Sequence, residues 1–226
     1  MLIAGIDEAG RGPVIGPMVL AIAVIEKKDE DKLLEIGVKD SKLLTPIERE
    51  KIYSILEKNL LEYNFIIVSP SEIDEFVEKN KLNELEALKA AKLISQLSKN
   101  PSIVYVDSPD VVMDNFAKRI KKYLPFNIKI VSEHKADKNY PIVSAASIIA
   151  KVKRDLEIKK ISEKFGDLGS GYSHDEITIK FLNDYLLKNN HFPDFVRKSW
   201  QTSKFLQENK FQKKIWDGYV SLDKKK

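Results

Sequence analysis

Residues 5–13 of this chain read Gly5-Ile6-Asp7-Glu8-Ala9-Gly10-Arg11-Gly12-Pro13. An apolar segment that begins at Leu2 ends there in two adjacent carboxylates, and glycines and an arginine follow at once. Glycine lets backbone amides approach a phosphate closely, and carboxylates at the end of a strand suit hard divalent cations. The stretch therefore indicates metal-assisted chemistry on a phosphodiester, provided that further carboxylates join it in the folded chain.

Strands and helices alternate along the rest of the sequence. Apolar, β-rich segments predict strands over residues 2–7, 18–26, 64–69, 102–107 and 127–132. Helices are expected over 46–61, 84–98, 109–123, 141–165 and 173–189. After an opening pair of strands, this alternation predicts an α/β fold in which helices cover a sheet. We expect a catalytic domain over residues 1–182 and a C-terminal helical, basic extension over residues 183–226.

Two of the expected helices open with a capping box. Thr45-Pro46-Ile47-Glu48 pairs a capping threonine with a glutamate three residues later and has proline at the first helical position. Ile47 is expected on the same apolar face of this helix as Ile52 and Leu56. Ser173 and Glu176 form the second capping box, which makes Ser173 the expected N-cap of the helix that follows.

The composition is that of an ordinary soluble globular protein. The 226 residues are 43% hydrophobic and 32% charged, enough for one large domain or a domain with an appendage. The absence of cysteine excludes a disulfide framework and a thiolate metal site, and it fits a reducing cytoplasm. The longest apolar run, 18–25, is too short to cross a membrane, and the first residues do not resemble a signal peptide. We therefore expect a cytoplasmic protein and, without a heptad pattern, a monomer.

The net charge of +4 is concentrated at the C-terminus, because residues 201–226 hold seven lysines and three acids. Aromatic residues recur among and before these lysines: Phe192, Phe195, Trp200, Phe205, Phe211, Trp216 and Tyr219. An amphipathic helix packed on the catalytic domain explains the aromatic residues better than stacking on bases does. A basic tail of this kind could follow a phosphate backbone, and a solvated helix with a frayed lysine end is an equal alternative.

Deleting the chain after about Phe205 is expected to weaken binding to nucleic acid and to flatten its dependence on salt. The reason is that each lysine near a phosphate releases counterions on binding, so removing lysines reduces the salt slope. Binding curves measured across a salt series test this prediction. A deletion that left those curves unchanged would contradict it.

Carboxylates that lie far apart in the sequence are candidates for one metal site. Asp7 and Asp107 both stand at the end of a predicted strand. Ligands of open α/β sheets bind beyond the carboxyl ends of the strands, so neighbouring strands would bring these two side chains into one crevice. Glu8 and Asp137, the latter in the polar loop before the long helix, complete a group of four. Four carboxylates in one place repel one another unless divalent cations such as Mg²⁺ or Mn²⁺ lie between them.

Each of these residues also has an ordinary structural explanation. A strand-end aspartate often caps the next helix or turn, and Glu8 could pair with Arg11. Side chains of neighbouring strand residues face opposite sides, so Asp7 and Glu8 can converge only if the strand ends or twists at Glu8. The glycines fit neither a P-loop nor a dinucleotide fingerprint, and a tight turn between two strands would explain them equally well.

Five blocks of the sequence together resemble one family, ribonuclease HII, in the order in which that family has them. They are Gly5 to Pro13, Asp40-Ser41-Lys42-Leu43, Val106-Asp107, His134 to Val152 and Gly169-Ser170-Gly171-Tyr172. The blocks cover residues 2 to about 178, and the compact length and lack of cysteine look like the archaeal branch.

This resemblance implies a ribonuclease H-like fold, with a five-stranded mixed sheet in the order 3-2-1-4-5 flanked by helices. It implies an endonuclease that cuts the RNA strand of RNA–DNA hybrids and cuts 5′ of ribonucleotides embedded in duplex DNA. The products would carry 5′-phosphate and 3′-hydroxyl ends, and the cofactor would be Mn²⁺ or Mg²⁺, with two ions when substrate is bound.

The resemblance also assigns roles by position. Asp7, Glu8, Asp107 and Asp137 match the catalytic, metal-binding acids. Gly10, Arg11 and Gly12 match the loop whose backbone reads the 2′-hydroxyl, and Tyr172 matches the tyrosine that stacks on a sugar. Phosphate contacts are implied for Lys42, Ser144 and Ser147. On sequence alone, Ser144 and Ser147 are equally well explained as cap and packing positions of the long helix.

Two other functions compete with this one. A DNA junction nuclease of the same superfamily would use the same acids, but the loop that reads a 2′-hydroxyl argues against it. A hybrid-binding module without activity would gain by losing carboxylates that repel phosphate, so four acids argue against that alternative.

Overall fold

The computed structural model describes residues 1–38 and 44–210, and its centre is one mixed sheet. The strands are β1 (Leu2–Ala9), β2 (Met18–Glu26), β3 (Glu62–Val68), β4 (Ile103–Asp107) and β5 (Lys129–Glu133). They lie in the order β3-β2-β1-β4-β5, with β1–β2 and β2–β3 antiparallel and β1–β4 and β4–β5 parallel. This confirms the predicted fold class and strand order.

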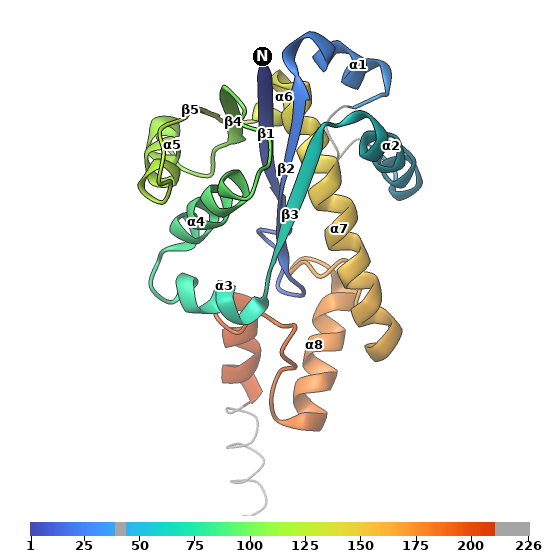
Figure 1. Cartoon of the computed structure of the whole chain (residues 1–226). Helices are drawn as coiled ribbons and strands as arrows, with labels where there is room; N and C mark the ends of the chain where they lie inside the picture. The colour runs from blue at the N-terminus through green and yellow to red at the C-terminus, as the bar shows by residue number, and fades with distance from the viewer. Residues whose placement is uncertain (39–43, 211–226) are drawn as a thin grey trace, which may run out of the picture.

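Helices cover both faces of the sheet (Figure 1). The labelled helical elements are η1 (Lys27–Asp29), α1 (Glu30–Glu35), α2 (Pro46–Asn59), α3 (Pro70–Val77), α4 (Leu82–Ser95), α5 (Met113–Lys122), α6 (Ala136–Asn139), α7 (Pro141–Phe165) and α8 (Glu176–Asn189), and residues 201–210 are also helical. One hydrophobic core joins α1, α2 and α7 to the sheet, and a second joins α3, α4 and α5 to the opposite face. Strand β2, which lies between β3 and β1, is buried on both sides, as its continuous apolar sequence requires.

The long helix α7 crosses β1 at very short range, and Gly5 makes this crossing possible. A methyl group added at Gly5 would lie 2.5 Å from the carbonyl carbon of Ile142 and 2.6 Å from the backbone nitrogen of Val143. The backbone of the first turn of α7 therefore occupies the space that any side chain at position 5 would need. This contact places the start of α7 directly over the strand that carries Asp7.

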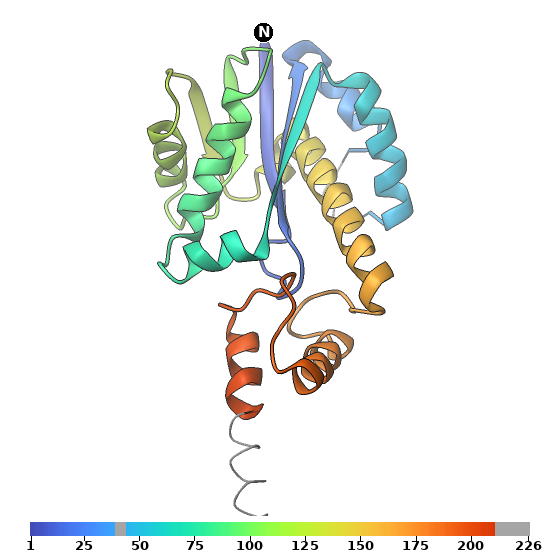
Figure 2. The same cartoon turned by 60° about the horizontal axis from the view of Figure 1, so that its bottom comes forward.

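The C-terminal part of the chain returns beneath the lower ends of β1 and β2 (Figure 2). Ile15 and Val196 form an isolated antiparallel bridge, and the amide of Arg197 donates to the carbonyl of Val14 at 2.9 Å. A third hydrophobic cluster joins this loop to α8 and to Phe192. Helix α8 runs across residues 182 and 183, and the division of the chain into two units at that point stays a prediction.

Local details of two helices differ from the sequence-based expectation. The N-cap of α8 is Asp175, whose side chain accepts from the amide of Ile177 at 2.9 Å, so the prediction of Ser173 was wrong. The Thr45–Glu48 capping box of α2 is present. However, Ile47 in that helix is 80% exposed, because the core contacts of α2 come from Ile52, Tyr53 and Leu56. At 3.6 residues per turn, Ile47 lies about 140° from Ile52 and about 180° from Leu56 around the helix, so the expectation that the three share one face was wrong.

Candidate active site

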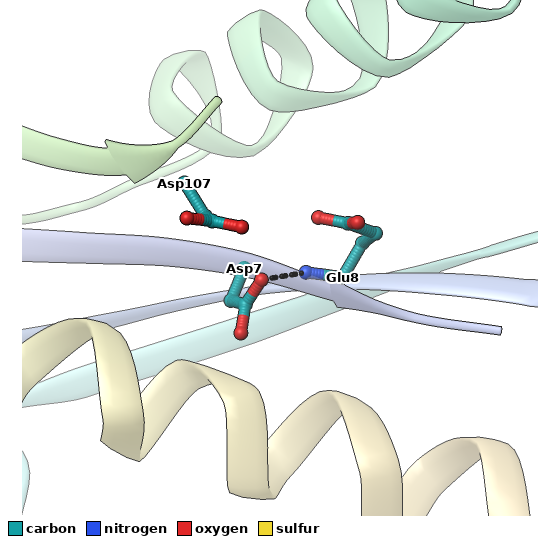
Figure 3. Close-up of side chains that lie close together, drawn as sticks. All are labelled: Asp7, Glu8 and Asp107. Atoms are coloured by element: carbon teal, nitrogen blue, oxygen red, sulfur yellow. Dashed lines mark hydrogen bonds between the residues drawn. The ribbon is translucent and has the colours of Figure 1, made fainter. Parts of the chain in front are cut away.

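Three carboxylates converge at the carboxyl ends of two neighbouring strands. Strands β1 and β4 are parallel and in register up to Ile6 and Val106, so the next residue of each is an aspartate. Oxygen atoms of Asp7, Glu8 and Asp107 all lie within 4.8 Å of one another (Figure 3). The convergence of Asp7 and Asp107 that the sequence indicated is therefore present in the structure.

Glu8 reaches this cluster from a continuous strand. Strand β1 does not end at Glu8, because Glu8 and Ala9 still pair in register with Leu20 and Val19 of β2. The side chains of Asp7 and Glu8 leave the strand on opposite sides, and Asp7 points toward α7 (Figure 3). Oδ1 of Asp7 accepts from the amide of Glu8 at 2.8 Å, which ties the two residues together at this end of the strand.

Burial and mutual repulsion govern the charges of this cluster. Desolvation raises the pKa of Asp7 well above its ordinary value, and the nearby carboxylates of Glu8 and Asp107 raise it further. The pKa of Glu8 is also raised, first by burial and then by Asp107, while Arg11 opposes the shift. Hard oxygen donors that repel one another at this separation are a suitable ligand set for Mg²⁺ or Mn²⁺, because a cation between them removes the repulsion.

Asp137 joins the site from the short helix α6. The backbone amide of Ala136 donates to Oδ1 of Asp107 at 2.8 Å, so Asp107 orients the turn that carries Asp137. Asp137 is buried, and it lines the same pocket as the other three acids. The four sequence-predicted acids therefore surround a single concavity of about 250 Å³.

Of the other predicted site residues, five line the pocket, one lies behind it and one is outside the described residues. Gly10, Arg11, Gly12, Ser147 and Tyr172 line the pocket with the acids, and Tyr172 is 38% exposed there. Ser144 is buried behind the pocket, where its hydroxyl donates to the carbonyl oxygen of Asp137, so the structure gives it a supporting position. Lys42 lies outside the described residues.

Two basic residues of α7 line the pocket and were not predicted. Lys151 and Arg154 follow Ser147 at intervals of four and three residues, which puts all three on one face of the helix. That periodicity is the sequence signal that could have found them. Arg154 is buried against the loop of residues 10–12, which we call the glycine loop. A side chain at Gly10 would overlap the guanidinium of Arg154. Gly10 also has a φ of +84°, so both space and backbone conformation require glycine there.

The side chain of Arg11 is hydrogen-bonded to a carboxylate other than Glu8. Its Nε donates to Oε1 of Glu86 at 2.7 Å, and its Nη2 donates to Oδ1 of Asn83 at 2.7 Å. Arg11 therefore forms its ion pair with Glu86, and its charge also lowers the pKa of Glu8. Glu86 is buried in α4, and burial together with the nearby Glu8 carboxylate raises the pKa of Glu86 to about 8, against the opposing effect of Arg11.

This raised pKa predicts a pH-dependent stability. A carboxyl group whose pKa is higher in the folded chain than its ordinary value of 4.5 stabilises the fold when protonated. That contribution is fully present below pH 4.5 and is lost as the pH rises through about 8. The free energy of unfolding, measured by urea titration without metal, should therefore fall from pH 5 to pH 8 less steeply in Glu86→Gln than in the parent.

The matched control is Glu163→Gln, which changes an exposed glutamate on α7. It should leave the pH dependence of the parent unchanged. Parallel stability curves for the parent and Glu86→Gln over this pH range would show that Glu86 does not titrate there.

Within the described residues, no helix is both long and apolar enough to span a membrane. A family model described as Ribonuclease HII matches residues 4–203. A curated relative named Ribonuclease HII, from Pyrococcus furiosus, is 47% identical over 224 residues, which cover 99% of this chain and 98% of the relative.

Two solved structures resemble this fold closely. The crystal structure of the ribonuclease H2 from Pyrococcus horikoshii OT3 has a TM-score of 0.87 and 48% sequence identity, covering 92% of this chain and 98% of that chain. A structure of the PCNA:RNase HII complex from Archaeoglobus fulgidus has a TM-score of 0.81 and 41% identity, covering 89% of this chain and 96% of that chain.

Proposed function

The chain belongs to the ribonuclease HII family, and we propose that its pocket cleaves the RNA strand of RNA–DNA hybrids and cuts 5′ of single ribonucleotides in duplex DNA. The enzyme is a ribonuclease H, and the proposal concerns its substrate range and the residues that act. The observation that carries the proposal is the convergence of Asp7, Glu8 and Asp107 in a pocket that is also lined by the glycine loop of residues 10–12.

In this proposal the four acids hold the divalent cations. Asp7 and Asp107 contribute from neighbouring parallel strands, Glu8 from the opposite side of β1, and Asp137 from α6. Two bound Mg²⁺ or Mn²⁺ ions would supply Lewis-acid stabilisation of the phosphate and activate the attacking water, which leaves 5′-phosphate and 3′-hydroxyl ends. The oxygen-only donor set and the raised pKa of Asp7 support this assignment.

The remaining lining residues would bind and orient the nucleic acid. The backbone of Gly10, Arg11 and Gly12 would contact the 2′-hydroxyl, and Tyr172, across the pocket mouth from Gly12, would pack on a sugar. Ser147, Lys151 and Arg154 line the α7 side of the pocket and would face phosphate oxygens. We also propose that Lys42 contacts a phosphate. The same proposal includes a monomeric protein and a cytoplasmic location.

The deciding experiment uses duplex DNA that carries one embedded ribonucleotide, with an all-DNA duplex as the control. We expect a cut just 5′ of the ribonucleotide that needs Mn²⁺ or Mg²⁺ and disappears when the metal is chelated. Cleavage of a DNA junction without cleavage of this duplex would keep the metal site and overturn the substrate. No cleavage of either, or of a long hybrid, would favour a hybrid-binding module without activity.

A further inference from the structure

The glycine loop of the pocket is held from behind by two side chains of the C-terminal segment. Arg197 is fully buried and donates from Nη2 to the carbonyl of Gly10 and from Nη1 to the carbonyl of Arg11 at 2.8 Å. Trp200 donates from Nε1 to the carbonyl of Gly12 at 2.9 Å. Three successive carbonyl groups of the loop therefore point toward Arg197 and Trp200.

This arrangement determines where the loop amides point. All peptide bonds of the described chain are trans, so each N–H points opposite to the carbonyl of the residue before it. Because the carbonyls of Gly10 and Arg11 face Arg197, the N–H groups of Arg11 and Gly12 face away from it. In the described part of the chain, neither amide donates to a protein acceptor. These residues line the pocket, so two donors are available to a ligand there.

Arg197 and Trp200, which together we call the clamp, are themselves anchored to the rest of the fold. Nε of Arg197 donates to the carbonyl of Gly16 at 3.1 Å, and its guanidinium lies 4.7 Å from the centre of the Trp200 ring. Oxygens of Asp74, in α3, accept from the amides of Lys198 and Ser199 at 2.8 Å and 3.0 Å. The segment that carries Arg197 and Trp200 is thus fixed to helix α3 on one side and to the loop on the other.

If Arg197 only stabilised the fold, its guanidinium would not need to bind the carbonyl groups of this loop. The hydrogen-bond partners of the buried Arg197 guanidinium are carbonyl oxygens, and burial together with the nearby Arg154 lowers its pKa to about 9. Burying a charge in this way is costly, and a loop that only had to turn between two strands could present its carbonyls to water instead. The arrangement satisfies the carbonyls and leaves the donors of the same peptides available on the side of the pocket.

We propose that Arg197 and Trp200 are positioning residues that aim the Arg11 and Gly12 amides at the ribonucleotide and thereby set the preference for a 2′-hydroxyl. This inference rests on the proposed function of the loop. Trp200 acts on the same loop through the Gly12 carbonyl, and the peptide that follows Gly12 has no N–H because residue 13 is proline.

The test measures binding to two duplexes that differ only in one 2′-hydroxyl. All proteins carry Asp7→Asn so that no cleavage occurs in the presence of Mg²⁺, and each is titrated with the single-ribonucleotide duplex and with the all-DNA duplex. Losing two aligned hydrogen bonds should reduce the ratio of the two affinities by about tenfold in Arg197→Lys and by a smaller factor in Trp200→Phe. The affinity for the all-DNA duplex should stay unchanged in both variants.

The control is Lys198→Ala, which removes an exposed positive charge next to Arg197 without touching the loop. Its affinity ratio should match that of the parent. Melting temperatures identify any variant that fails to fold, and Trp200→Phe carries the test if Arg197→Lys does not fold.

The outcomes separate this inference from the proposed function. If the Asp7→Asn parent has no preference for the ribonucleotide, the assignment of the loop fails before the clamp is tested. If the parent has the preference and a folded Trp200→Phe or Arg197→Lys keeps the full ratio, the clamp inference is overturned. Equal losses of affinity for both duplexes would also overturn it, because general damage to the site would not act through the 2′-hydroxyl.

Discussion

Asp7→Asn should lower cleavage of a ribonucleotide-containing duplex by about a thousandfold or more, because the proposed metal site loses the charge of one of its ligands. Binding of the same duplex should be unchanged or tighter, since one carboxylate that repels phosphate is gone. Single-turnover cleavage and a separate binding titration measure the two effects. The metal-free fold should also become more stable at neutral pH, because Asp7 is buried among like charges that raise its pKa.

The matched control for this substitution is Asp114→Asn, which makes the same chemical change at an exposed position in the first turn of α5. It should leave both cleavage and binding at the level of the parent. Cleavage by Asp7→Asn at a rate close to the parent would exclude Asp7 as a required metal ligand, whatever the behaviour of the control.

Gly5→Ala should destabilise the fold by about 3 kcal/mol, because the new methyl group meets backbone atoms of Ile142 and Val143 that cannot move aside without shifting α7. For a chain of this length, that change corresponds to a fall in melting temperature of about 6–12 °C. Thermal unfolding in the absence of metal measures it. Cleavage should fall as well, since the strand displaced by α7 carries Asp7.

Gly12→Ala provides the comparison within the same stretch of sequence. A methyl group at Gly12 would lie 3.7 Å from Cε1 of Tyr172, an ordinary contact, and Gly12 has no positive φ. Stability should therefore change by no more than about 0.5 kcal/mol. Cleavage should nevertheless fall, because the methyl group enters the space between the loop and Tyr172. A Gly5→Ala protein as stable as Gly12→Ala would show that the crossing of α7 and β1 can relax.

Local sequence patterns were sufficient to predict the five strands and to single out the four acids as candidates for one site. Continuous apolar strands, helical periodicity and capping residues act over a few neighbours, so they can be recognised without the fold. The strand order that brings Asp7 beside Asp107 was expected from the resemblance of five sequence blocks to one family, and the structure confirms that order. The metal-binding roles themselves, like the substrate contacts, stay predictions.

Tertiary structure alone decided which residues support the site. Arg197 contacts Gly10 from 187 positions away, and Arg11 contacts Glu86 from 75 positions away, so no local pattern could reveal either pair. The cap of α8 is different, because the contacts of Asp175 are local: its carboxylate accepts from the amides of Ile177 and Ser170. Sequence periodicity reports which side of an element is apolar, whereas the hydrogen-bond partners of a buried polar group depend on which distant segments the packed cores bring together.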